Sequence, residues 1–93
     1  MLHKKHVQAL QNGEVTIAEL RGITSEEMEA GISAGRKLMD SGEYQAAAEV
    51  LAGLALYDPF RPDVWSALEE LFRRECLPEP ANLFSSLARV MAA

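Results

Sequence analysis

Two stretches of the chain resemble each other at a spacing of 34 residues. When Met28–Pro59 is placed on Pro62–Ala93, the paired positions include Gly31 with Trp65, Ala34 with Leu68, Leu38 with Phe72, Ala47 with Ala81 and Leu54 with Ala88. A period of this length, with small residues where two helices must touch, is typical of stacked helix–turn–helix units. Such units usually bind other proteins, so the repeat predicts a protein-binding function and argues against an enzyme.

The composition fits one globular domain. The 93 residues carry a net charge of −5, and 48% of them are apolar, so a packed core is expected and disorder is not. The acidic balance argues against a nucleic-acid partner, which would require a basic face. We expect no membrane span, because no apolar run approaches about 18 residues, and no secretion signal, because the N-terminus lacks an apolar core segment. The single cysteine, Cys76, fits a reducing cytoplasm.

Helix signals divide the chain into an arm and two helical hairpins. Residues 2–11 can form a short helix with Leu2, His6, Val7 and Leu10 on one side. Thr16 with Glu19, and Thr24 with Glu27, match the capping box that begins a helix. The longer helices are expected over Ser25–Asp40, Glu43–Tyr57, Pro62–Glu75 and Ala81–Ala92. No segment alternates with period two, so the sequence predicts an all-α single domain with an arm (1–23), a first hairpin (24–59) and a second hairpin (60–93).

Both hairpins resemble the tetratricopeptide repeat. The matching positions are Gly35, Leu38, Gly42, Tyr44, Ala47, Leu51 and Pro59 in the first copy, and Trp65, Leu68, Phe72, Ala81 and Ala88 in the second. Gly35 and Ala47 would allow two backbones to approach closely. The second copy is atypical, because Cys76 stands in place of the turn glycine and Pro78 and Pro80 stiffen the turn.

A longer series of motifs points to one family of such repeats. The motifs are Leu10–Gly13, Thr16–Leu20, Ile23 with Ser25, Ser41–Ala47 and Leu56–Phe60. Over residues 8–75 their order is similar to the N-terminal half of the bacterial type III secretion chaperones that hold hydrophobic translocator proteins. The resemblance implies a short, two-repeat version of such a chaperone, with a concave groove that clasps a segment of a secreted client. Members of the family tend to carry aromatic residues where this chain has Arg36 and Met39.

The expected partner surface lies on the first helix of each hairpin, because these helices line the concave face of a stack. The predicted partner-binding residues are Glu29, Ile32, Arg36, Met39, Asp63, Ser66, Glu70, Arg73 and Arg74. The alternative is that these residues form only a solvated helix face.

A second predicted contact surface lies on the last helix. Phe84, Leu87 and Met91 are expected to form an oligomer interface, such as that of a homodimer, unless the N-terminal arm folds over them.

No residue pattern indicates catalysis, a cofactor or a metal centre. His3 and His6 have a spacing that can bind a metal ion, but no acidic or cysteine ligand stands near them in the sequence. Cys76 has no evident base beside it, so an idle thiol is expected. We therefore predict a bacterial cytoplasmic protein that holds a client without chemistry. The alternative is a small dimerising adaptor that has no peptide client.

Overall fold

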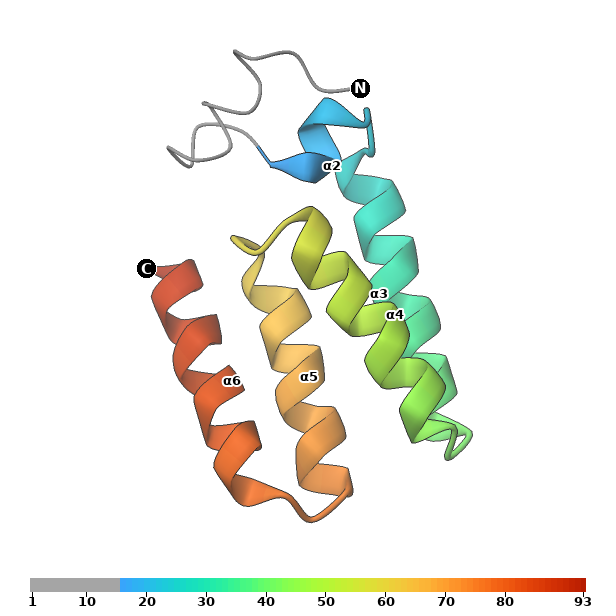
Figure 1. Ribbon diagram of the computed structural model, residues 1–93, viewed down its shortest axis with the longest axis vertical. Helices are drawn as coiled ribbons and strands as arrows, with labels where there is room; N and C mark the ends of the chain where they lie inside the picture. The colour runs from blue at the N-terminus through green and yellow to red at the C-terminus, as the bar shows by residue number, and fades with distance from the viewer. Residues whose placement is uncertain (1–15) are drawn as a thin grey trace.

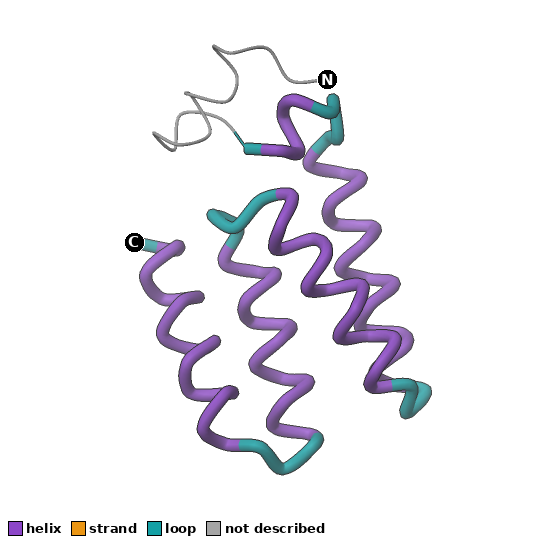
Figure 2. Tube along the Cα trace, viewed as in Figure 1, coloured by secondary structure: helices purple, strands orange, loops and turns teal. Residues whose placement is uncertain are grey.

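The computed structural model describes residues 16–93, which form five helices. These are α2 (Ile17–Leu20), α3 (Ser25–Asp40), α4 (Tyr44–Tyr57), α5 (Pro62–Arg74) and α6 (Pro78–Ala92) (Figures 1 and 2). No strand occurs among the described residues, so the prediction of an all-α fold is confirmed. The helix predicted over 2–11 lies outside the described residues.

Local sequence signals set where these helices begin. At the start of α3 the Thr24 hydroxyl accepts from the Glu27 amide, and the Glu27 carboxylate accepts from the Thr24 amide, both at 3.1 Å. This is the predicted capping box. At the start of α6 the prediction was wrong by three residues, because the helix begins at Pro78 and not at Ala81. A proline is tolerated in a first helical turn, where its missing N–H has no intrahelical partner.

The turns of the two hairpins close with the same pattern of backbone hydrogen bonds. The bonds run from Gly42 N to Met39 O (3.0 Å), Glu43 N to Leu38 O (2.9 Å), Cys76 N to Arg73 O (3.0 Å) and Leu77 N to Phe72 O (2.9 Å). This is the Schellman arrangement, which needs a left-handed residue after the helix. Gly42 has φ +79° and Cys76 has φ +62°. Gly42 and Cys76 are 34 residues apart, so the two turns share their backbone geometry at the spacing of the repeat.

The two hairpins lie side by side. Helix α3 packs against α4, α5 packs against α6, and α5 also contacts both helices of the first hairpin (Figure 1). The core that joins them consists mainly of Met28, Ile32, Met39, Ala47, Leu51, Ala55, Val64, Ala67, Leu68 and Leu71. Helix α6 contributes only Ala81 to the fully buried residues, so most of its apolar side chains remain partly accessible.

Helices α3 and α4 approach each other closely at Gly35. A Cβ added to Gly35 would lie 2.8 Å from Cδ2 of Leu51, nearer than real Cβ atoms come to a neighbour. The buried Ala47 lies one turn before Leu51 on the same side of α4. The small residues of the repeat therefore do allow a close contact, and the group that fills the space at Gly35 is the leucine side chain.

Candidate functional site

The structure corrects part of the predicted partner surface on α3. Ile32 is only 6% exposed and Met39 only 1%, and both side chains belong to the core between the hairpins. The prediction that these two residues face a groove was wrong, because their side of α3 is the side that packs against the neighbouring helices. The apolar spot expected on the concave face therefore does not exist in the described part of the chain.

All the charged residues predicted for that surface form ion pairs, either with one another or with Asp40, Arg61 and Glu69. The ion pairs are Arg36–Glu70, Arg74–Asp40 (2.8 Å), Arg74–Glu70 (2.8 Å), Arg61–Asp63 (2.7 Å), Arg61–Glu29 (3.8 Å) and Arg73–Glu69 (2.9 Å). Ser66 is half-buried on α5. Several of these bonds cross from α3 to α5 or to the residue just before it. The charged face thus ties the two hairpins together, and its arginines already have carboxylate partners.

The ionisation of this face follows from the same bonds. The hydrogen bond from Arg61 lowers the pKa of the Asp63 carboxyl below its ordinary value and raises the pKa of the Arg61 guanidinium. Glu70, and after it Asp40, raise the pKa of Arg74. Each shift favours the charged form. These three groups are therefore fixed charges at neutral pH and are unsuited to exchanging protons with a substrate.

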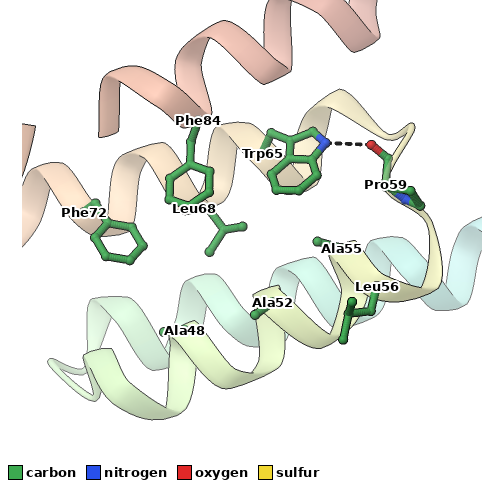
Figure 3. A pocket seen from close by; sticks show the side chains of 9 residues that line it. All are labelled: Ala48, Ala52, Ala55, Leu56, Pro59, Trp65, Leu68, Phe72 and Phe84. Carbon is green, nitrogen blue, oxygen red and sulfur yellow. Dashed lines mark hydrogen bonds between the residues drawn. The ribbon is translucent and has the colours of Figure 1, made fainter. Parts of the chain in front are cut away.

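An apolar hollow lies elsewhere, between α4 and α6, with α5 at its floor (Figure 3). We call it the apolar cleft, and its volume is about 520 Å³. Its lining consists of Ala48, Ala52, Ala55, Leu56, Pro59, Trp65, Leu68, Phe72 and Phe84. The cleft is open along one side, and its size falls within the range of sites that bind ligands or peptide segments.

The aromatic side chains of the apolar cleft hold one another in place. Phe84 reaches from α6 and stacks on Trp65 with ring centroids 6.0 Å apart, and its centroid lies 5.2 Å from that of Phe72. The indole Nε1 of Trp65 donates to the carbonyl oxygen of Pro59 at 2.7 Å (Figure 3). The polar atom of the indole is therefore already satisfied, so the side chains that line the cleft recognise apolar groups by shape and burial.

The sequence analysis did not predict this site. A signal was nevertheless present. Ala48, Ala52 and Leu56 form a second apolar stripe beside the buried residues Ala47, Leu51 and Ala55 of α4, so that helix is apolar over more of its surface than its contact with α3 requires. The exposed end of this second stripe is Leu56, of which 74% is accessible.

The predicted oligomer residues on α6 are all half-buried. Phe84 turns toward α5 and the apolar cleft. The large apolar residues that α6 does expose are Leu83, at 59%, and Val90, at 66%. An interface through Phe84, Leu87 and Met91 stays a prediction, and Leu83 and Val90 are the exposed large apolar residues of α6.

Other kinds of site receive little support from residues 16–93. Within that range no group of three or more His, Cys, Asp or Glu side chains could hold a metal ion. His3 and His6 lie outside it. None of the described helices is both long and apolar enough to cross a membrane. Cys76 is a free, exposed thiol at the turn before α6.

Taken together, the described residues 16–93 are all-helical and form two adjoining hairpins, with an ion-paired face and an apolar cleft. Comparisons with protein-family models, with curated proteins and with solved structures found no match to this chain.

Proposed function

We propose that this chain is a protein-binding module that holds an apolar segment of a client protein in the apolar cleft. The observation that carries the proposal is the cleft itself, whose lining residues are all apolar and which continues onto the exposed side chain of Leu56. Contiguous apolar surface on a small protein usually marks an interaction site. Each large apolar side chain that a client buried there would contribute roughly 1.5–3 kcal/mol.

The ion-paired face is a weaker candidate for the same role. A partner would have to desolvate charged groups that already pair with each other, and that desolvation offsets the gain from new contacts. The cleft demands no such exchange, since the one polar side-chain atom among its residues, Trp65 Nε1, is bonded to Pro59. The client site is therefore assigned to the apolar cleft between α4 and α6, and not to the ion-paired face of α3 and α5 that the sequence predicted.

The resemblance to the type III secretion chaperones gives the proposal its specific form. The client would be a hydrophobic secreted protein, and the activity would be holding, in the cytoplasm of a bacterium. A holding protein covers the apolar segment until export and so lowers the concentration of free, aggregation-prone client. The module needs no cofactor for this role, and no nucleic-acid partner is expected.

The proposal is tested by blocking the cleft. Ala52→Arg places a long charged side chain in the cleft, and Ala34→Arg makes the same change at an exposed position of α3 outside it. We expect one secreted protein with apolar segments to co-purify with the wild-type chain and with Ala34→Arg but not with Ala52→Arg. A peptide of the segment so identified should change the fluorescence of Trp65. Equal binding to both variants would overturn the assignment of the cleft.

A second function is favoured by the exposed apolar residues of α6. Leu83 and Val90 would suit an adaptor that dimerises through this helix. Light scattering on the isolated protein tests this alternative. A stable dimer that becomes a monomer in Leu83→Glu with Val90→Glu would support the adaptor, whereas a monomeric wild-type protein would exclude it.

A further inference from the structure

The apolar cleft is bordered by two helices that run in the same direction. Helices α4 and α6 form its sides, and α5, which runs the opposite way, forms its floor (Figures 1 and 3). The cleft-lining stretch of α4 from Ala48 to Leu56 measures about 12 Å along the helix axis. Ala48 and Ala52 present only methyl groups there, so the axis of another helix can approach that of α4 to about 8 Å. The cleft therefore has the shape of a groove for one further helix.

The walls of the cleft offer almost no hydrogen-bonding groups to a bound backbone. Apart from Pro59, the lining residues belong to helices, and away from the helix ends their backbone N–H and C=O groups pair within the helix. The one polar side-chain atom of the lining, Trp65 Nε1, donates to Pro59. An extended segment laid on this surface would bury backbone N–H and C=O groups without partners, which is unfavourable. A helical segment pairs these groups internally and can bury its apolar side without that cost.

Charged side chains distinguish the two ends of the cleft. At one end, Glu49 is exposed on α4 next to the cleft-lining Ala48, and Glu79 is exposed in the first turn of α6. At the other end, Leu56 also lines a smaller hollow of about 280 Å³ whose lining includes Arg21. None of these three charged residues forms an ion pair with another described residue. The cleft is therefore acidic at its first end and basic at its second.

We propose that the client segment binds in the apolar cleft as an amphipathic helix of about three turns, antiparallel to α4 and α6. Its C-terminal end carries basic residues beside Glu49 and Glu79, and its N-terminal end carries an acidic residue beside Arg21. Helices favour this distribution of charge, with acidic residues in the first turn and basic residues in the last. The inference rests on the function proposed above and adds the conformation, direction and charge pattern of the client segment.

Three synthetic peptides of identical composition and without tryptophan test the inference. In the first, leucines recur at helical spacing, glutamates occupy the first turn and lysines the last. The second places the same leucines in strict alternation, as in a strand. The third keeps the helical spacing but exchanges the glutamates with the lysines. Each peptide is titrated into the full-length protein while the fluorescence of Trp65, the one tryptophan of the chain, is followed.

We expect the first peptide to bind the wild-type protein and Ala34→Arg equally, and to bind Ala52→Arg about tenfold more weakly. Its circular dichroism should become more helical on binding. The alternating peptide should bind the wild-type protein about tenfold more weakly than the first. The charge-exchanged peptide should bind about threefold more weakly, since the charged groups on the rim are exposed. In Glu49→Gln with Glu79→Gln, the difference between the first and third peptides should shrink.

The conformation and the direction can be overturned separately. Equal binding of the helical and alternating peptides, or binding without a gain in helicity, would overturn the helical conformation. Equal binding of the first and third peptides, or a difference that persists in the double glutamine variant, would overturn the direction.

Failure of the proposed function has a different signature. If the first peptide does not bind, the helical client is overturned, whereas the function is overturned only if the client also co-purifies equally with Ala52→Arg and Ala34→Arg. If the client co-purifies with Ala34→Arg alone while the first peptide fails, the cleft holds its client in another conformation.

Discussion

Arg36 and Glu70 stand 34 residues apart, at equivalent positions of the two repeats, and their side chains form an ion pair. The same offset separates Asp40 from Arg74, which pair at 2.8 Å. In both pairs a residue of the first hairpin therefore contacts its own equivalent in the second, which requires α3 and α5 to lie side by side in register. These pairs are sensitive to any sliding of one hairpin past the other.

Arg36→Met should lower the free energy of unfolding by less than about 1 kcal/mol, because both charged groups are partly exposed. The effect should shrink in about 1 M salt, where exposed charges are screened. Urea titrations at low and high salt measure it. Lys37→Met is the control, since Lys37 forms no ion pair with another described residue. Equal losses in the two variants would show that the pair contributes nothing.

Cys76→Gly should stabilise the protein. Cys76 closes its turn with φ +62°, a conformation that is unfavourable for a residue with a Cβ atom. Glycine removes that strain, and the expected gain is about 0.5–1 kcal/mol, because glycine also adds freedom to the unfolded chain. Thermal unfolding under reducing conditions measures the change. Cys76→Ala keeps the Cβ and should unfold at the wild-type temperature, so a similar gain there would point to the thiol and not to the backbone.

Gly35→Ala should destabilise the fold by about 1–3 kcal/mol, the usual range for overpacking a core. The added methyl group would lie 2.9 Å from Cγ of the fully buried Leu51 and would push α3 away from α4. Gly53→Ala is the matched control on α4, because a Cβ there meets nothing within 4 Å. That change should raise the helix propensity and stabilise by about 0.5–1 kcal/mol. The urea midpoint should therefore fall below the wild-type value in Gly35→Ala and rise above it in Gly53→Ala.

Phe84→Ala should cost about 1–3 kcal/mol of stability, less than a fully buried phenylalanine would, because Phe84 is only half-buried. The ring links α6 to Trp65 and Phe72, so its loss should also widen the apolar cleft and change the fluorescence of Trp65. Phe60→Ala serves as the control at an exposed loop position and should change stability by less than about 0.5 kcal/mol. An unchanged Trp65 spectrum in Phe84→Ala would contradict the packing described for the floor of the cleft.

Asp63 should make stability depend on pH in the acid range. Arg61 holds the pKa of Asp63 below its ordinary value of 3.8, so between these two values the unfolded chain binds more protons than the folded one. The contribution of Asp63 is therefore complete above the ordinary value and is lost as pH falls through the folded pKa. Urea midpoints measured against pH should show a shallower acid decline in Asp63→Asn than in the wild-type protein. Glu49→Gln removes an exposed carboxylate that forms no ion pair with another described residue, and it should keep the wild-type slope.

The helices were predictable because their signals are local. The capping box at Thr24 and the proline at Pro62 fixed two helix starts, and the positive φ of Gly42 was implied by its residue type. The start of α6 was misjudged, since two prolines near a turn fit a loop as well as a first helical turn. Local patterns thus predict the elements well, except where one residue type serves two kinds of structure.

The site was harder to predict because it depends on how far apart α4 and α6 stand. Helical spacing put Ile32 and Arg36 on one face of α3, yet Ile32 is buried and Arg36 meets Glu70. A hydrophobic pattern predicts that a side chain is buried, but it does not predict which neighbouring element buries it. The apolar cleft exists because α6 adds only one residue to the buried core. The second apolar stripe of α4 indicates that this helix has more apolar surface than α3 covers, but it does not reveal that α6 leaves that surface open.

Along α4, Ala48 and Ala52 present only methyl groups to the apolar cleft, and neither is among the fully buried residues. Leu51 lies on the neighbouring, buried stripe of the same helix and packs against α3 at Gly35. Different positions of α4 therefore determine which groups the apolar cleft binds and how stable the fold is. Single substitutions at Ala48 or Ala52 can change the shape of the apolar cleft with little loss of thermal stability. The binding selectivity of the cleft can therefore change in evolution while the fold is conserved.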